Sequence, residues 1–472
     1  MFRFIFSALG RIPWPVWLIS IGALAWFGRN ILLIIATIIA FHPIPIPPLF
    51  QGEPETLREA RLQDLRHFDH VRRNERSMTP DMRTRFDAQL ARLEAEAGHS
   101  SDAEFQLGLA RAQAVIDNGH SNASATRMVE HFPRWPVRMT VLDGEFRVLR
   151  VLPGFENLLG ARLTAIGDVE AGVAAARFRD AFGGNNANFS TIVPVLLDTP
   201  DYLAAVGLDA SRARFETQDG AVIEIDLPAL ASTEGARRTG AETLRLPWRS
   251  ESADWIAVEP AGDPLRLRRR DHDYWFEEIE PGIVYLALRA NFDDESGETI
   301  SDFARRAEAE IRALAPRAVI LDQRANRGGD LTRTHELMDS LGESVGPEGR
   351  VYLLASGATF SAAIVNLAAV KATAPDQTVL IGEPIGDRLQ FWAEGWWYSL
   401  PNSGFRARYS TGYYDLQNGC TGWLRCPWGS LHIFPILVDD LDIDIPAPMD
   451  FDAYAAGRDP ALEAALAAAR TL

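Results

Sequence analysis

Two short runs of apolar residues organise the second half of the chain. Residues 318–321 read AVIL and lead into the turn NRGG, and residues 351–355 read VYLLA and lead into SGATFS. Unbroken runs of this length, rich in Val, Ile and Leu, are typical of strands buried on both faces. Helical patterns alternate with such runs from 282 to 386. The pattern predicts an α/β core with a mostly parallel sheet and crossover helices.

A longer apolar stretch lies at the N-terminus. The span from 13 to 41 is 29 residues long, or about 43 Å as a helix, which is enough for one tilted transmembrane helix. Arg3 and Arg11 precede it, which favours an N-terminus on the cytoplasmic side. No small-residue cleavage site follows. We expect residues 1–50 to form a single-pass anchor in the inner membrane, with the rest facing the periplasm or cell exterior. If Arg29 marks the inner edge, the span begins after it.

The segments between these two regions predict two further units. Residues 51–135 are rich in Arg, Glu and Leu at helical spacing, which predicts a solvated helical segment. Its last helix is expected to end at Asn118 and Gly119 as a C-cap, which leaves His120 in a tight turn. Residues 136–270 carry recurring short strand patterns and a charged connector. The sheet core then occupies residues 271–472.

Side chains suited to acyl transfer follow the two central strands. Ser361 opens an Ala-rich helix, and Gly328 and Gly329 end the other strand with unobstructed backbone N–H groups. Reactive groups of parallel sheets lie at the carboxyl ends of strands. Acyl transfer requires a nucleophile, such as a hydroxyl, and nearby N–H donors that stabilise the oxyanion. The ordinary alternatives are an N-cap for Ser361 and a simple tight turn for the glycines.

At these positions the chain resembles the S41 serine peptidases, which include C-terminal processing and tricorn-type enzymes. The family motif D-x-R-x-N-x-G-G, its T-x-S-A element and its G-E-x-x-G turn are matched by Asp322, Arg324, Asn326, Gly328, Gly329, Thr359, Phe360, Ser361, Ala362, Gly382, Glu383 and Gly386. The family's G-H-[ST] element is matched by Gly119, His120 and Ser121. The resemblance covers about residue 103 to the C-terminus. It implies a ClpP/crotonase-like core, a degenerate PDZ-like module within 136–270, and a polypeptide substrate.

The resemblance also implies catalytic roles. Ser361 is the expected nucleophile, and the oxyanion donors are the N–H groups of Gly328 or Gly329 and of Ala362. The bacterial branch uses a lysine base after the G-E-x-x-G turn, but this chain has Asp387 and Arg388 there. Arginine cannot act as a base because it stays protonated.

The choice of base therefore falls on a histidine. Lys371 is the chain's single lysine, and ten helical residues after Ser361 it lies about 15 Å away on another face. His120 is the expected general base, as in the tricorn-type branch. Ser121, Glu383 and Asp415 are candidate orienting groups for it. His335 is a rival base that we expect to lie in a surface helix.

Composition limits the partners. A formal net charge of −17 argues against binding to nucleic acid. We find no His-Glu-x-x-His motif, P-loop or Rossmann fingerprint and expect no cofactor. Cys420 and Cys426 could close a short disulfide in an oxidising compartment or remain free thiols. The competing functions are a peptidase, an esterase or amidase that uses the same site, and a catalytically silent binding protein that kept the fold.

Overall fold

The computed structural model describes residues 52–226, 255–269, 271–420, 422, 425–427 and 436–472, with a few single positions between 26 and 41. The predicted anchor in residues 1–50 lies outside this range, apart from those positions. Among the described residues, none of the helices has the length and apolar character that crossing a bilayer requires.

A six-stranded sheet forms the core, in the order β17-β12-β11-β10-β9-β8. All neighbours are parallel except β8 and β9, which are antiparallel. The strands are β8 (Tyr274–Glu280), β9 (Ile283–Leu288), β10 (Ala318–Asp322), β11 (Arg350–Ala355), β12 (Thr378–Gly382) and β17 (Ile445–Pro446). The predicted mostly parallel α/β core is therefore confirmed. Every residue of β10 is buried, as expected for an apolar strand covered on both faces.

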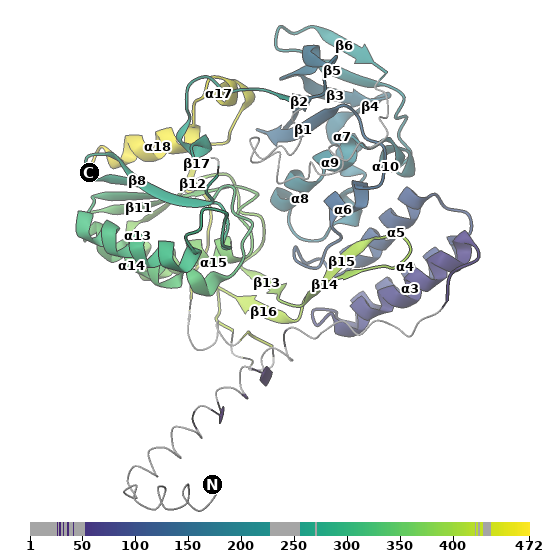
Figure 1. Ribbon diagram of the computed structural model, residues 1–472, viewed down its shortest axis with the longest axis horizontal. Helices are drawn as coiled ribbons and strands as arrows, with labels where there is room; N and C mark the ends of the chain where they lie inside the picture. Colours follow the sequence, from purple (N-terminus) through teal and green to yellow (C-terminus); the bar gives the residue numbers. More distant parts are fainter. Residues whose placement is uncertain are drawn as a thin grey trace, which may run out of the picture.

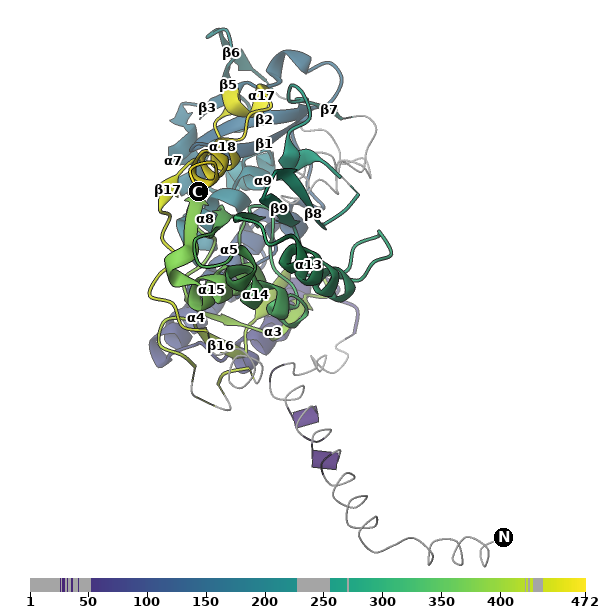
Figure 2. The ribbon, with the colours of Figure 1, turned by 90° about the vertical axis from the view of Figure 1, so that its left-hand side faces the viewer.

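Helices cover both faces of this sheet (Figures 1 and 2). One face packs against α13 (Ile300–Leu314), α14 (His335–Val345) and α15 (Ala362–Thr373). The other face packs against α18 (Pro460–Ala469), which follows α17 (Phe451–Ala455). Helix α15 is buried along nearly its whole length, and its residues share a hydrophobic cluster with α14, β13 and β16. The start of α15 thereby has a fixed position relative to the ends of the strands.

The second part of the molecule joins the N-terminal helices to a β module (Figure 1). The helices are α3 (Leu57–Asn74), α4 (Pro80–Glu96), α5 (Asp102–Ala114) and α6 (Ala125–Val129). The module contains β1 (Val137–Leu142), β2 (Glu145–Val151), β3 (Arg162–Ile166), β4 (Val169–Glu170), β5 (Ala213–Glu216), β6 (Val222–Ile225) and β7 (Ile256–Ala257), with α7 (Ala171–Ala176), α8 (Asn186–Ile192), α9 (Pro194–Leu197) and α10 (Pro200–Ala205). One hydrophobic cluster spans both sets.

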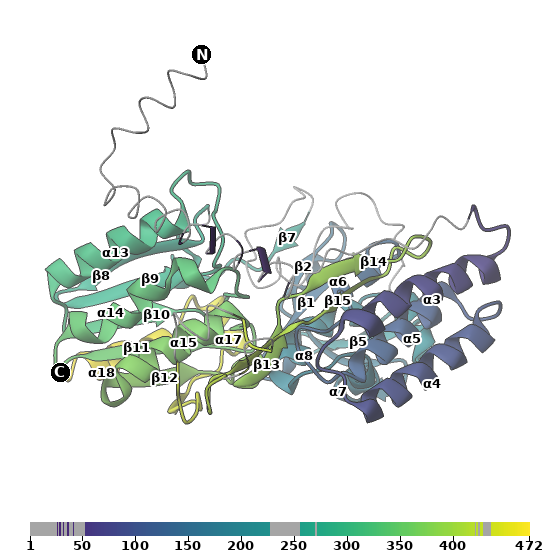
Figure 3. The same ribbon diagram turned by 90° about the horizontal axis from the view of Figure 1, so that it is seen from below.

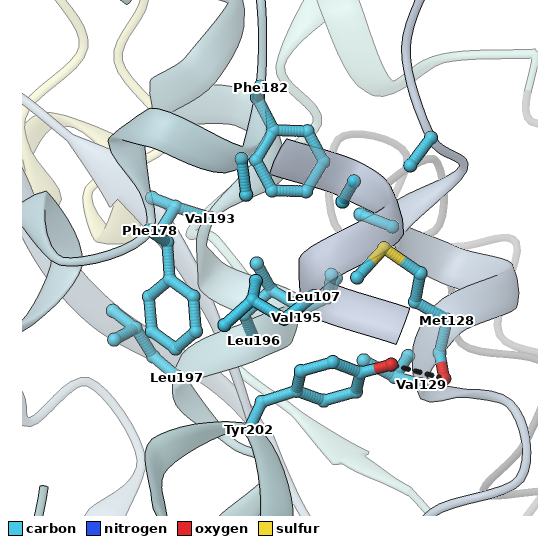
Figure 4. Packing of buried hydrophobic residues seen from close by; sticks show 14 of the residues in the cluster. Leu107, Met128, Val129, Phe178, Phe182, Val193, Val195, Leu196, Leu197 and Tyr202 are labelled. Atoms are coloured by element: carbon cyan, nitrogen blue, oxygen red, sulfur yellow. Dashed lines mark hydrogen bonds between the residues drawn. The ribbon is translucent and has the colours of Figure 1, made fainter. Parts of the chain in front are cut away.

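Figure 4 shows the centre of this cluster, where Phe178 and Leu197 of the module pack near Leu107 of α5. The hydroxyl of Tyr202 donates to the carbonyl of Met128 at 3.1 Å. The helical segment and the module therefore share one interior. The division into separate domains at 51–135 and 136–270, and the PDZ-like character of the module, remain predictions.

Two antiparallel strand pairs connect the halves (Figure 3). They are β13 (Gln390–Ala393) with β16 (Gly412–Asp415), and β14 (Trp396–Ser399) with β15 (Arg406–Tyr409). The first pair adjoins the sheet core, whereas the second packs with the N-terminal helices through residues such as Phe405 and Tyr409. The carboxyl end of β12 is thus linked directly to the region that holds His120.

Two local predictions have clear outcomes. Helix α5 ends at Ala114, four residues before the predicted cap, and the left-handed residue in the following turn is Asp117, with φ of 50°. The predicted C-cap at Asn118 and Gly119 is therefore wrong. Cys420 and Cys426 form a disulfide, which is one of the two alternatives that the sequence left open.

Candidate active site

Three loops meet at the carboxyl edge of the parallel sheet. They follow β10, β11 and β12, and they carry the sequence Asn326 to Gly329, the sequence Ser356 to Ser361, and the turn Glu383 to Asp387. Because β11 lies between β10 and β12, the loop that carries Ser361 lies between the other two. The strand order explains why these three motifs, which are far apart in the chain, form one site.

Ser361 has an unusual backbone conformation immediately before α15. Its φ is 59° and its ψ is −125°, and its side chain makes no capping hydrogen bond. A non-glycine residue at positive φ costs about 1–3 kcal/mol and is often found at functional sites. An ordinary N-cap has extended backbone and an accepting side chain, so Ser361 does not fit that role. Its hydroxyl has no hydrogen-bond partner among the described residues.

Gly328 packs directly against the serine. A Cβ built on Gly328 would lie 2.5 Å from Cβ of Ser361 and 2.8 Å from N of Ala362, and its φ is +96°. Only glycine satisfies both the close approach and the positive φ at this position. The loop after β10 therefore brings its backbone alongside the candidate nucleophile.

The predicted oxyanion donors differ in availability. The N–H of Gly328 already donates to Oδ1 of Asn326 at 2.8 Å, so it is not a free donor in this structure. The N–H groups of Gly329 and Ala362 have no acceptor in the described part of the chain. Of the two glycines that the sequence left open, Gly329 is therefore the better candidate, together with Ala362.

A buried amide network fixes the loop after β10. Nδ2 of Asn326 donates to Oδ1 of Asn291 at 2.8 Å, and the backbone N–H of Asn326 donates to the carbonyl of Gln323 at 3.0 Å. The carbonyl of Asn326 accepts from the N–H of Phe360 at 3.0 Å. The asparagine of the motif thus ties the glycine loop to the loop of Ser361. Buried hydrogen-bond networks of this kind restrict the loop to one geometry.

His120 reaches this site from the opposite half of the molecule. Its ring is stacked between Phe360, with centroids 4.3 Å apart, and Phe391, with centroids 5.1 Å apart. Its turn is held by Asn118, whose side chain accepts from the N–H of Trp392 and donates to its carbonyl. Phe360 directly precedes Ser361, so the imidazole stacks on the residue next to the candidate nucleophile.

Asp387 is the carboxylate beside this imidazole. Its Oδ2 lies 3.4 Å from Nδ1 of His120, and both side chains are buried, with exposed fractions of 2% and 0%. The two groups are at ion-pair distance without forming a hydrogen bond, and both ring nitrogens lack a hydrogen-bond partner. No hydrogen bond joins the Ser361 hydroxyl to the ring within the described residues.

The surroundings keep the imidazole neutral. Burial lowers the pKa of His120, and the nearby charge of Arg408 acts in the same direction, whereas Asp387 opposes both. The net direction is downward from the ordinary value, because removing the imidazolium from water outweighs the attraction of the carboxylate. A neutral imidazole near pH 7 is the form that can accept a proton.

The other predicted residues are placed elsewhere. The hydroxyl of Ser121 accepts a hydrogen bond from Nδ2 of Asn118 and donates one to the hydroxyl of Ser410. Asp415 accepts from the N–H groups of the following turn, and none of its hydrogen bonds reaches His120. Glu383 lines a separate cavity. None of these three is brought to the imidazole, and their catalytic roles remain untested predictions.

Lys371 and His335 lie away from the site, as expected. Nζ of Lys371 is 2.7 Å from Oδ1 of Asp440, at the last turn of α15. His335 begins α14, and its Nε2 lies 3.4 Å from Asp339 one helical turn later. Neither side chain is near the hydroxyl in any contact of the described structure.

Sequence reasoning missed Asp387 as a partner of His120. A usable signal was present, because Asp387 follows the G-E-x-x-G turn at the place where the resembled bacterial enzymes have their catalytic lysine. Asp387 lies against His120, whereas Arg388 beside it pairs with Asp117 at the surface.

A cavity of about 490 Å³ adjoins these groups. It is bounded by Gly328, Phe360 and His120 on one side and by the segment from Ser124 to Thr126 and Trp397 on the other. A cavity of this size can hold several side chains of an extended peptide. Its position beside Gly328 places any occupant next to the candidate nucleophile.

Comparison with known proteins supports the fold. No protein-family model matches the sequence, and no curated protein matches it. Mature CPAF is 11% identical, with a TM-score of 0.55, over 88% of this chain and 97% of that chain. CPAF complexed with lactacystin gives 12% identity and a TM-score of 0.55, over 88% and 98%. The photosystem II D1 C-terminal processing protease gives 12% identity over 85% and 98%, with a TM-score of 0.37.

At these identities the likeness concerns the fold. The two CPAF matches extend over most of both chains, so they include the sheet core, the module and the helices. The overall architecture is similar to that of CPAF.

Proposed function

We propose that this chain is a serine peptidase of the S41 type that hydrolyses peptide bonds through an acyl-enzyme on Ser361. His120 is the general base, and Asp387 orients it in place of the candidates suggested by the sequence. The observation that carries the proposal is the arrangement of His120, which faces Asp387 through Nδ1 and stacks on the residue next to Ser361.

The chemistry follows from this arrangement. His120 takes the proton of the Ser361 hydroxyl as the oxygen attacks the carbonyl carbon, and Asp387 stabilises the resulting imidazolium. The N–H groups of Gly329 and Ala362 donate to the oxyanion, and loss of one such donor typically costs about 10²–10³ in rate. The imidazolium then returns the proton to the leaving amine, and water releases the acyl group by the same steps.

The direct test is covalent labelling of Ser361. Wild-type protein, Ser361→Ala and Ser344→Ala are treated with an active-site phosphonate and assayed on an unfolded protein substrate. Ser344 is a suitable control because its hydroxyl only donates to the carbonyl of Ser340 within α14. We expect labelling and hydrolysis in the wild type and in Ser344→Ala but not in Ser361→Ala. Full activity of Ser361→Ala would refute the proposal.

A second candidate function is a catalytically silent binding protein. It is favoured by one observation, the lack of a hydrogen bond between the Ser361 hydroxyl and His120, whose Nε2 is buried and without a partner. Folded wild-type protein that binds an unfolded polypeptide but is not labelled by the phosphonate would support this alternative. Faster turnover of an aryl ester than of any peptide would instead support an esterase or amidase.

We also propose that residues 1–50 anchor the protein in the inner membrane, and that residues 136–270 form a degenerate PDZ-like module outside the cytoplasm. The disulfide between Cys420 and Cys426 supports the location, because such bonds persist in oxidising compartments. Alkaline extraction of membranes provides the test. The full chain should stay with the membrane, whereas a chain beginning at residue 51 should be released.

A further inference from the structure

A second cavity lies at the same edge of the sheet, between the core and the β module. Its volume is about 220 Å³. It is separate from the cavity beside His120, although Arg289 and Ala325 line both. Its walls come from β1, β2, the loops after β10, β11 and β12, and the C-terminal segment around α17. No step of the proposed peptidase mechanism uses it.

One wall of this cavity is apolar. Leu142 and Leu149 from the module face Leu267 and Met449 from the core side. Leu149 belongs to a small buried cluster with Phe451 of α17, so this wall is firmly packed. A cavity of roughly 150 Å³ with such a lining accepts a benzene ring. The present cavity is larger, so an apolar group of that size fits with room for a polar head.

The lining of this cavity also contains a guanidinium nitrogen that lacks an acceptor. Nη2 of Arg266 is buried and has no hydrogen-bond partner. The nearest carboxylate is that of Asp459, whose Oδ2 lies 3.9 Å from Nε of Arg266. That carboxylate is already committed, because both its oxygens accept from Arg324 at 2.6 and 2.9 Å. A buried donor without an acceptor is costly, so the site is suited to a ligand that supplies one.

Glu383 lines the same cavity and is suited to the same ligand. Its carboxyl group has no hydrogen bond among the described residues. Burial raises its pKa, and the positive charge of Arg324 only partly opposes this. In its protonated form Glu383 donates one hydrogen bond, and Arg266 can only donate. A carboxylate can accept from both residues, and its negative charge makes the hydrogen bond from the guanidinium a charge-assisted one.

We propose that this cavity binds a monocarboxylate whose apolar body is about the size of a benzene ring. The carboxylate accepts hydrogen bonds from Arg266 beside Glu383, and the apolar body packs on Leu142, Leu149 and Met449. The proposal is independent of Ser361 and of peptidase activity. It stands or fails on binding alone.

The first test compares three ligands that differ only in their head group. Full-length wild-type protein is titrated with 3-phenylpropanoate, 3-phenylpropanamide and 3-phenylpropylamine, and binding is followed by ligand-observed NMR and calorimetry. We expect the carboxylate to bind at least about tenfold more tightly than the amide, as charge-assisted hydrogen bonds predict. Equal affinities for acid and amide, tighter binding of the amine, or no binding of the acid would each overturn the proposal.

The second test alters the two ends of the cavity separately. Arg266→Met should weaken the carboxylate about 10- to 100-fold and the amide by a smaller factor, because the amide loses only a neutral hydrogen bond. Leu142→Trp fills the apolar end and should abolish binding of both. Arg305→Met is the matched control, because Arg305 is exposed on α13 and pairs with Asp302. Unchanged carboxylate binding in Leu142→Trp would overturn the proposal, and this holds even if Arg266→Met does not fold.

Discussion

Replacing Asp387 by asparagine is the sharpest test of the proposed catalytic arrangement. The substitution keeps the shape of the side chain and removes its charge. At the observed separation of 3.4 Å, a carboxylate and an imidazolium attract each other by about 5 kcal/mol at an effective dielectric constant near 20. This attraction exists only once His120 has taken the proton, so it acts on the transition state. Its loss predicts a fall in kcat/KM of about 10³-fold.

The assay is hydrolysis of an unfolded protein substrate as a function of pH. The neutral form of His120 is the active one, so the rate should be constant above the pKa of His120 and fall as the pH drops through it. Burial already places that pKa below its ordinary value. Because Asp387 raises the pKa of His120, the variant should have its acidic limb at lower pH than the wild type. A residue that only stabilised the fold would not move this limb.

Two results would refute the reasoning. Folded Asp387→Asn with more than about a tenth of wild-type activity would show that the carboxylate does not orient the base. The comparison with Asp415→Asn is equally informative, because Asp415 is the carboxylate suggested by the sequence. Its oxygens are held by the turn that follows β16, so we expect little change. A loss confined to Asp415→Asn would assign the orienting role to that residue.

Three further variants test the surroundings of the site. Gly119→Ala should lower activity strongly with a smaller effect on folding, because a Cβ there would lie 2.6 Å from Oδ2 of Asp387. Thermal unfolding measures the effect on folding, and phosphonate labelling measures the effect on activity. Gly328→Ala should reduce labelling about a hundredfold, because a Cβ would lie 2.5 Å from that of Ser361. Lys371→Met should keep full activity and change the free energy of unfolding by less than about 1 kcal/mol, since it loses only the ion pair with Asp440. Loss of activity in folded Lys371→Met would indicate that Lys371 is the base.

The sheet and the position of Ser361 at the start of a helix could be predicted because they depend on local sequence. Strands β10 and β11 follow unbroken apolar runs, and Ser361 precedes an Ala-rich helix. The end of α5 was mispredicted because Gly119 looked like a helix cap. A glycine is needed at position 119 for a different reason, because Asp387 and Phe360 leave no space there for a side chain. A contact between segments hundreds of residues apart has no local signature.

The pairing of His120 with Asp387 illustrates this limit further. It depends on Phe391 and on the contacts between the turn of Asn118 and β13, which bring the two halves of the molecule together. The hydrophobic pattern of neither segment predicts that the two segments pack against each other. The motif resemblance supplied His120, and the G-E-x-x-G turn marked the loop that carries Asp387, but the contact between the two side chains depends on the packing of the loop after β12 against the imidazole.

The stacking of His120 also indicates which group must move for catalysis. Phe360 and Phe391 hold the ring on both faces, and Asp387 lies at Nδ1, so the imidazole has little freedom to rotate. The serine hydroxyl is less constrained, because Ser361 is partly exposed and its side chain has no hydrogen bond. A change of rotamer at Ser361 costs far less than moving an imidazole out of an aromatic stack. In the proposed mechanism, the hydrogen bond to Nε2 is therefore made by the serine when a substrate occupies the cavity beside Gly328.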